Sequence, residues 1–153
     1  MKIAVLSDIH GNLAALQAIL DDLVGWEPDR VIVNGDTVNR GPQTFAAWQV
    51  VQGQATRAGW TVLRGNHERY VFSREWERPG LNHLAQEITR QSAWSFRQHH
   101  GRTAELAALP TGCTLTGPHG GGPVRIRHAS MWRDQDGLYT ETPDEQLAAQ
   151  ITP

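Results

Sequence analysis

The chain has 153 residues, of which 39% are hydrophobic and 20% charged, and these proportions are typical of a soluble globular protein. Its length suffices for one hydrophobic core, so we expect residues 1–153 to form a single domain. A net charge of −2 with scattered basic residues gives no sign of a surface for nucleic acid or anionic membrane. The single cysteine, Cys113, excludes an internal disulfide, and no apolar run reaches the roughly 20 residues of a membrane span. We therefore expect a cytoplasmic protein.

The first part of the chain alternates short apolar runs with amphipathic stretches. The apolar runs predict strands at residues 3–6, 31–33 and 60–63, and the first two strands are expected to be buried on both faces. An amphipathic helix is predicted after the first strand, with Asn12 as its N-cap and Gly25 as its C-terminal stop.

A second helix is predicted between the second and third strands. It is expected to begin at Gly41-Pro42, because proline suits the first helical position, and to end at Gly59. Its inner face would carry Phe45, Trp48, Val51 and Ala55. Strands and helices that alternate through short loops predict right-handed crossovers and a parallel sheet covered by helices.

The rest of the chain is predicted to be helical first and then to form a second sheet. Residues 68–109 read as polar helices with a break at 78–80, and glycine and proline mark a loop between two short strands at 113–116 and 124–128. A last helical turn is predicted over residues 142–150. The packing anchors of the helical region are expected to be Trp76, Leu84, Ile88, Trp94 and Phe96.

Polar side chains follow each of the three predicted parallel strands. Asp8 and His10 follow the first strand, Asp36 follows the second, and Asn66 and His67 follow the third. Because the functional crevice of an open parallel sheet lies at the carboxyl ends of its strands, these side chains are expected to meet at one edge.

Carboxylate, imidazole and carboxamide groups together suit divalent ions such as Mn²⁺, Fe²⁺ or Zn²⁺. Two such ions roughly 3.5–4 Å apart can clamp a phosphoryl group and acidify a bridging water toward hydroxide. Each stretch alone also has a simpler interpretation, because Asp8 could cap the following helix and Gly35-Asp36 could form a common turn. Their joint placement favours the metal site, with Asp36 as the bridging ligand. A dinucleotide site is excluded because no G-x-G-x-x-G follows the first strand.

Three sequence blocks carry a resemblance to a known family. Asp8-Ile9-His10-Gly11, Gly35-Asp36-Thr37-Val38-Asn39-Arg40-Gly41 and Gly65-Asn66-His67-Glu68 resemble the signature blocks of calcineurin-like metallophosphoesterases. The phosphoprotein-phosphatase-like bacterial branch, with its diadenosine tetraphosphatase relatives, is the most similar. The resemblance implies an α/β fold in which a sandwich of mixed β-sheets is flanked by helices.

The resemblance also implies roles for individual residues. Asp8 and His10 would bind the first metal, Asp36 would bridge, and Asn66 and His128 would bind the second metal. His67 resembles the family's general acid or transition-state-stabilising histidine, and Arg40 resembles the arginine that grips phosphate, for which a guanidinium is suited by its paired donors. The cofactors implied are two divalent ions, with Mn²⁺ favoured over Fe, Zn or Ni. The competing interpretation of His128, taken alone, is that it is an ordinary histidine at the end of a strand.

The remaining histidines and the tryptophans are expected to have surface or packing roles. His83, His99, His100 and His119 have no partners at ligand spacing. Trp132 is a partial exception, because with Arg133 it follows His128 closely enough to line a substrate mouth.

The sequence departs from the family pattern at Asn39, where this branch usually carries an aspartate that orients the catalytic histidine. The carbonyl of Asn39 is expected to accept from the ring N–H of His67, which stabilises the imidazolium less than a carboxylate would. This difference favours a small phosphoester or nucleotide substrate over a phosphoprotein.

A second departure concerns the closing Gly-His-x-His block of the family, since no histidine follows His128. Each metal would then lack one imidazole, so we expect this chain to be the N-terminal portion of a longer domain. The predicted function is hydrolysis of a phosphoester, as a phosphatase or phosphodiesterase, with no membrane partner and with the oligomeric state left open. The alternative is a catalytically silent metal-binding or interaction module.

Overall fold

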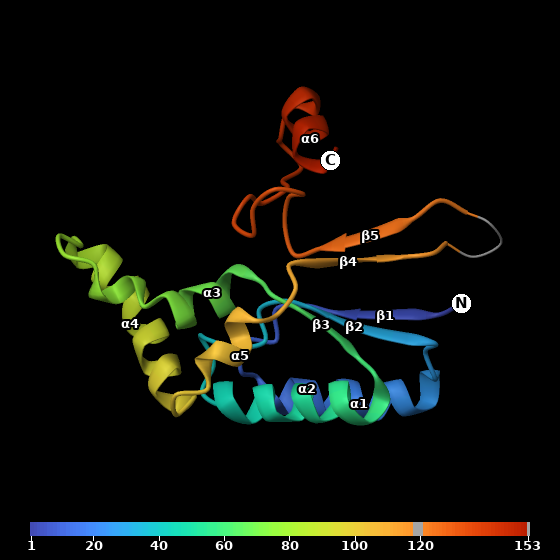
Figure 1. Ribbon diagram of the computed structural model, residues 1–153, viewed down its shortest axis with the longest axis horizontal. Helices are drawn as coiled ribbons and strands as arrows, with labels where there is room; N and C mark the ends of the chain where they lie inside the picture. The colour runs from blue at the N-terminus through green and yellow to red at the C-terminus, as the bar shows by residue number, and fades with distance from the viewer. Residues whose placement is uncertain (118–120, 153) are drawn as a thin grey trace.

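The computed structural model describes residues 1–117 and 121–152, and the side chain of Ile88 and the loop residue His119 lie outside this description. Three parallel strands, β1 (Ile3–Leu6), β2 (Arg30–Asn34) and β3 (Thr61–Leu63), form the first sheet in the order β1-β2-β3. Two long helices, α1 (Leu13–Trp26) and α2 (Thr44–Ala58), lie side by side along one face of this sheet (Figure 1). The expected alternation of strands and helices is therefore confirmed.

Helix α1 differs from the prediction only at its C-terminal end. Asn12 caps the helix as expected, because its side chain accepts a hydrogen bond from the backbone N–H of Ala15. The helix continues through Gly25 and ends at Glu27, whose φ of 49° is left-handed and whose N–H returns to the carbonyl of Leu23. Gly25 is thus an interior helical residue and not the stop that the sequence predicted.

Helix α2 begins two residues later than predicted, at Thr44 instead of Pro42. The reason is that the backbone N–H groups of Gly41 and Gln43 donate to the carbonyls of His10 and Gly11 in the loop after β1. This stretch is therefore part of a loop–loop contact and not of the helix. The predicted end at Gly59 is confirmed by its left-handed φ of 67°.

The hydrophobic core lies between the helices and the first sheet. Trp48 and Val51 of α2 and Leu16 of α1 are fully buried there against Val33 of β2. Of the predicted inner face of α2, Phe45 and Ala55 are partly buried and pack against the same core. The prediction that β1 is buried on both faces is wrong, because Val5 is 52% exposed.

The region after β3 is helical, as predicted. It contains α3 (Asn66–Ser73), a 3₁₀ turn η1 (Glu75–Glu77), α4 (His83–Gln98) and α5 (Thr103–Ala107), with the break at residues 78–80 between η1 and α4. Leu84 was expected to be a packing anchor but is 68% exposed at the start of α4.

Helix α4 contributes polar side chains to the buried region. Among the described residues, Ser92 and Ser95 of this helix and its C-cap His99 are buried. Ser95 and Thr44 join their hydroxyl groups at 2.9 Å, and the ring Nδ1 of His99 lies 2.9 Å from the carbonyl of Ser95. The contact between Ser95 and Thr44 joins α4 to the start of α2. Nε2 of His99 is buried without a partner among the described residues, and Phe96 of α4 packs against the hydrophobic core.

The second sheet is the antiparallel hairpin of β4 (Gly112–Leu115) and β5 (Val124–Arg127), which confirms the predicted pair of strands. It lies over the face of the first sheet opposite to α1 and α2 (Figure 1). The amide of Asn34, at the end of β2, donates to the carbonyl of Arg127 at the end of β5 and so ties the two sheets together. The first sheet of this α/β fold is thus parallel, and the second is antiparallel.

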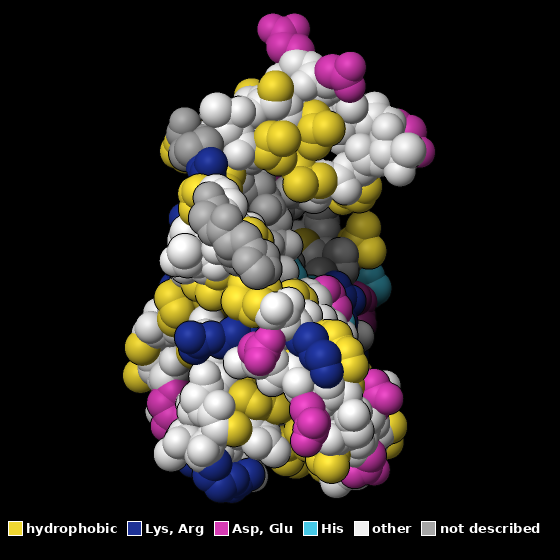
Figure 2. Space-filling view, turned by 90° about the vertical axis from the view of Figure 1, so that its right-hand side faces the viewer, with side chains coloured by type: hydrophobic (Ala, Val, Ile, Leu, Met, Phe, Trp, Pro, Cys, Tyr) yellow, Lys and Arg dark blue, Asp and Glu magenta, His cyan; other side chains and the backbone are white. Residues whose placement is uncertain are grey.

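The last helix, α6 (Asp144–Ile151), stands away from both sheets (Figure 1). It is tied to the segment after β5 by hydrogen bonds from the N–H of Met131 to Gln150 and from the indole of Trp132 to Ala149. Figure 2 shows hydrophobic side chains on this upper part of the molecule. In the segment after β5 and in α6, the large hydrophobic residues Trp132, Leu138, Tyr139 and Ile151 are exposed. None of the described helices is long and apolar enough to cross a membrane.

Candidate metal centre

The site lies where the three parallel strands end, and its loops have an unusual backbone. Asp8, His10 and Asp36 all have positive φ, at 58°, 47° and 55°, and so do Asn39 and Arg40, at 72° and 66°. Such angles are uncommon for residues other than glycine and persist only where the surroundings hold them. Five of them in two short loops indicate a backbone that is arranged to aim side chains at one point.

The two loops are held together by backbone hydrogen bonds. The N–H groups of His10 and Gly11 donate to the carbonyls of Asp36 and Thr37, and the N–H of Gly41 returns to the carbonyl of His10, each at 2.9 Å. The contact is too close for a side chain at Gly41, because a Cβ there would lie 2.0 Å from the carbonyl oxygen of His10. The loop after β1 and the loop after β2 therefore form one unit.

The side chain of Glu68 holds the backbone of the loop after β2 in place. Its carboxylate is fully buried and accepts hydrogen bonds from the backbone N–H groups of Gly65, Asp36, Thr37 and Val38 at 2.7–3.2 Å. Burial raises the pKa of Glu68, and the charge of Asp36 adds to this effect, while the backbone donors act in the opposite direction. Glu68 thus fixes the backbone on both sides of Asp36.

Asp36 is at the centre of the site and is only 2% exposed. One carboxylate oxygen, Oδ1, accepts a hydrogen bond from the backbone N–H of His67. The other, Oδ2, lies 3.3 Å from Nε2 of His128, 3.8 Å from Nε2 of His10 and 4.0 Å from Nε2 of His67. Burial raises the pKa of Asp36, but hydrogen bonds from His128 and His67 outweigh it and leave this pKa below its ordinary value.

His128 follows β5 of the second sheet, and its ring points toward Asp36. Its Nδ1 lies 2.7 Å from the backbone carbonyl of Asn34, which fixes the proton on Nδ1 and turns Nε2 inward. Nε2 lies 2.9 Å from the amide oxygen of Asn66 and faces Asp36. The hydrogen bond to Asp36 raises the pKa of His128 to about 9 in spite of burial.

Asp8 and His10 form the outer side of the site. The carboxylate of Asp8 is 58% exposed and accepts from the hydroxyl of Ser7, and its other oxygen lies 3.5 Å from Nε2 of His10. Nδ1 of His10 lies 3.4 Å from the carbonyl of Val38, so the second nitrogen, Nε2, faces Asp8 and Asp36.

His67 is buried beside Asp36, and its contact with Asn39 differs from the prediction. The amide nitrogen of Asn39, and not its carbonyl, lies 3.0 Å from Nδ1 of His67. The carbonyl oxygen of Asn39 accepts from the backbone N–H of Arg40, and the amide nitrogen also donates to the hydroxyl of Ser92. Asn39 therefore donates to His67, which makes Nδ1 an acceptor and leaves the ring proton on Nε2.

This arrangement keeps the imidazole of His67 neutral. Burial lowers the pKa of His67 to about 4, and the nearby His10 and Arg40 act in the same direction against the charge of Asp36. His67 therefore presents an Nε2–H donor and not an imidazolium to the centre of the site. His10 also packs edge-on against its ring, with centroids 4.6 Å apart.

Arg40 lies beside these groups on the wall of a cavity of about 290 Å³. His67, Asn66, Tyr70 and Trp76 line the same cavity. One guanidinium nitrogen of Arg40 reaches the side-chain oxygen of Gln91 at 3.4 Å, a long contact that leaves the other donors available to a bound anion. The cavity thus combines a guanidinium with the Nε2–H of His67.

Two overlapping groups of side chains in the site could hold a divalent ion. Among the described residues, Asp8, Asp36 and His128 form one group of possible ligands within 4.8 Å of one another, and His10, Asp36 and His67 form another. Asp36 belongs to both groups, and the imidazole and carboxylate donors suit Mn²⁺, Fe²⁺ or Zn²⁺. All eight predicted site residues lie around this point: Asp8, His10, Asp36, Asn39, Arg40, Asn66, His67 and His128.

Comparison with known proteins agrees with the fold and with these motifs. The family model of calcineurin-like phosphoesterases matches residues 1–150, so the chain belongs to this metallophosphoesterase family. Over 75 residues it is 36% identical to a symmetrical bis(5'-nucleosyl)-tetraphosphatase of Methylococcus capsulatus. That match covers 48% of this chain and 26% of the relative, so the alignment spans about a quarter of the length of this curated relative.

Solved structures share the architecture. A hypothetical protein from Pyrococcus horikoshii OT3 superposes with a TM-score of 0.77 at 16% identity, over 97% of this chain and 63% of that one. A metallophosphoesterase from Sphaerobacter thermophilus superposes with a TM-score of 0.54 at 28% identity, over 74% of this chain and 42% of that one. The predicted fold class is confirmed.

Two residues that position the site were not assigned a role from the sequence. Glu68 could have been recognised, because a glutamate three residues after Gly65 at the start of a helix is the usual partner of unsatisfied backbone N–H groups. Ser92 gave no signal, because it comes from α4, 53 residues after Asn39, and only the fold brings the two together.

Proposed function

We propose that the chain carries a two-metal centre for the hydrolysis of phosphoesters. The observation that carries this proposal is the position of Asp36, whose Oδ2 lies within 4.0 Å of the Nε2 atoms of His10, His67 and His128. Asp8 and His10 would hold one ion, Asn66 and His128 the other, and Asp36 both. Two divalent ions bound in this way draw charge from a phosphoryl group and lower the pKa of a coordinated water.

The protein side chains have separate tasks in this proposal. Arg40 binds non-bridging phosphate oxygens, because a guanidinium offers paired donors to them. His67 offers its Nε2–H as a hydrogen-bond donor to the leaving oxygen, which stabilises the charge that develops there, and Asn39 keeps the proton on Nε2 by donating to Nδ1. His128 is held by Asn34, so its Nε2 remains directed at Asp36.

The substrate proposed is a small phosphoester or a nucleotide, and Mn²⁺ is the ion proposed. The donation from Asn39 supports the small substrate, since it favours a neutral His67 over an imidazolium. The relatives named as symmetrical bis(5'-nucleosyl)-tetraphosphatases support a nucleotide.

Hydrolysis of p-nitrophenyl phosphate and of its bis-ester in the presence of Mn²⁺ tests the proposal. We expect turnover by the wild-type chain and a loss of more than about 100-fold in Asp36→Asn, since removal of a ligand should cost more than the removal of the groups that orient one. Asp21→Asn, on the outer face of α1, is the matched control and should keep full activity.

The ratio of the two rates separates a phosphatase from a phosphodiesterase. A chain that binds Mn²⁺ but turns over neither ester would contradict the proposed hydrolysis. That result would support the alternative of a metal-binding module without catalysis.

A further inference from the structure

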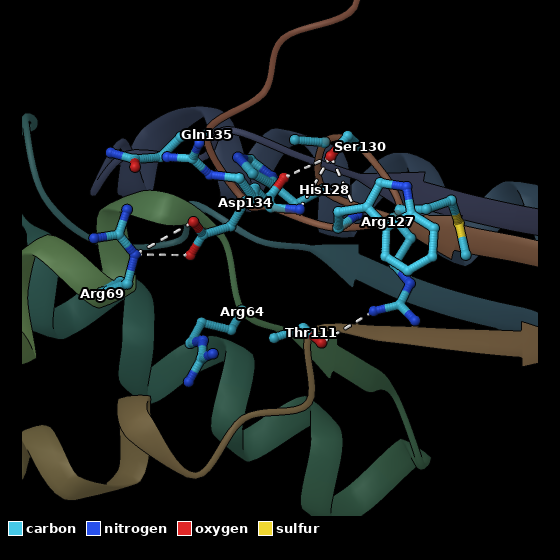
Figure 3. Close-up of a pocket in the computed structure, with 12 residues that line it drawn as sticks. Arg64, Arg69, Thr111, Arg127, His128, Ser130, Asp134 and Gln135 are labelled. Atoms are coloured by element: carbon cyan, nitrogen blue, oxygen red, sulfur yellow. Dashed lines mark hydrogen bonds and ion pairs between the residues drawn. The ribbon is translucent and has the colours of Figure 1, made fainter. Parts of the chain in front are cut away.

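A second pocket, rich in arginine, adjoins the candidate metal centre at His128. It has a volume of about 390 Å³, and its wall includes the side chains of Arg64, Arg69, Arg127 and Arg133. Among the described lining residues, Asp134 is the one carboxylate that faces these four cations. Figure 3 shows Arg64, Arg69 and Arg127 around the pocket, from the end of β3, from α3 and from β5, with His128 between them.

The two inner arginines have donors that no described residue uses. Arg64 gives Nη1 to the carbonyl of Ala107 at 3.1 Å, but its Nε is buried without a hydrogen-bond partner. Arg69 is held by Asp134 and Glu75, yet its Nη2 is also buried without a partner. Both nitrogens are enclosed by the protein, so the donors that an entering acceptor can reach are the other guanidinium nitrogens of the pocket.

The charge of the pocket is also only partly balanced. Among the residues that the structure describes, neither Arg64 nor Arg127 forms an ion pair, and Arg127 gives one donor to the hydroxyl of Thr111. Arg133 is 69% exposed and lies 3.7 Å from Asp136, so its pairing is loose. Among the described residues, Arg69 gives its Nε and Nη1 to carboxylates, whereas Arg64 and Arg127 each donate one hydrogen bond to an uncharged oxygen, so their charges remain unpaired.

We propose that this pocket binds a second phosphoryl group of the substrate, next to the one that is hydrolysed. Guanidinium groups from three elements offer several donors to one tetrahedral anion, which is the geometry that arginine provides for phosphate. His128 contributes to both the pocket and the candidate metal centre, so one extended molecule can reach both. The substrate class is therefore a molecule with at least two phosphate groups, and this inference rests on the proposed phosphoesterase function.

Binding of inorganic tripolyphosphate to the protein, measured by titration calorimetry after metal ions are chelated and dialysed away, tests the pocket without catalysis. We expect saturable binding that weakens with salt, and an affinity lower by about tenfold in Arg127→Gln and in Arg64→Gln. Arg125→Gln is the matched control, because Arg125 lies two residues away on β5 outside the pocket and should bind as the wild type does.

Several results would overturn the proposal. One is the absence of saturable binding, and another is an equal affinity in the wild type, Arg127→Gln and Arg64→Gln. Loss of binding in Arg40→Gln but not in Arg127→Gln would assign the anion to the cavity beside His67. If Arg64→Gln lowers the melting temperature, its weaker binding does not separate a lost contact from unfolding. The affinity of Arg127→Gln then decides, because Arg127 is exposed.

Kinetics distinguish this inference from the function on which it rests. Arg127→Gln should raise KM for a nucleoside triphosphate about tenfold more than KM for p-nitrophenyl phosphate, which has no second phosphoryl group. If neither substrate is hydrolysed, the proposed function fails, while tripolyphosphate binding still decides whether the pocket is an anion site.

Discussion

At the scale of single residues, the side chain that differs most from the expected arrangement is Asn39. An asparagine has both an acceptor and a donor, and here the backbone N–H of Arg40 occupies the acceptor. The amide nitrogen is left to face Nδ1 of His67 and the hydroxyl of Ser92. One backbone contact thus decides the tautomer of His67, and through it the proton that this ring can offer at Nε2.

Asn39→Asp should make Nδ1 of His67 a hydrogen-bond donor instead of an acceptor. A carboxylate at position 39 would accept a hydrogen bond from Nδ1–H and stabilise the imidazolium, so the pKa of His67 should rise from about 4 by about 1 to 3 pH units. The measurement is an NMR titration of the histidine ring carbons, with the His67 signal assigned from His67→Gln. A pKa that stays at about 4 would contradict the proposed role of Asn39. His99, which is buried away from the site, is the internal control.

At the scale of elements, the site is held by contacts between loops more than by the strands themselves. Backbone hydrogen bonds join the loops after β1 and β2, and the carboxylate of Glu68 at the start of α3 binds the second of these loops and Gly65. The close approach of Gly65 to Asp36 belongs to the same arrangement, because a Cβ at Gly65 would lie 2.1 Å from Oδ1. The three stretches of sequence therefore form one rigid support for Asp36.

Two glycine substitutions separate the effect of this loop–loop support on metal binding from a general effect on the stability of the protein. Gly41→Ala should destabilise the protein by about 2 kcal/mol and weaken Mn²⁺ binding, because its Cβ would push the carbonyl of His10 away. Gly25→Ala, in the interior of α1 with nothing within 4 Å, should stabilise it by about 0.5–1 kcal/mol without affecting the metal. Urea unfolding and Mn²⁺ titration of both variants provide the test. Equal metal affinity in Gly41→Ala and the wild type would argue against the loop–loop support.

At the scale of the whole molecule, the sequence predicted most of the features that local patterns determine. The strands, the cap at Asn12 and the end of α2 at Gly59 could be predicted, because apolar runs, capping residues and glycine act through short-range contacts. The polar motifs also predicted that the candidate site residues lie together, while their roles stay predictions. The later start of α2 and the buried contact of Ser95 in α4 with Thr44 could not be predicted, because each depends on a partner far away in the sequence. The same holds for the arginine-lined pocket, which β3, α3 and β5 form together.

The proposed two-metal centre depends on Asp36 holding two ions at once. Electron paramagnetic resonance of the protein loaded with two equivalents of Mn²⁺ tests this most directly, because two ions bridged by one carboxylate are exchange-coupled. We expect a coupled multiline signal from the wild-type chain, and uncoupled mononuclear Mn²⁺ in Asp36→Asn, with Asp21→Asn unchanged. An uncoupled signal from the wild-type chain at two bound equivalents would contradict the bridging role of Asp36.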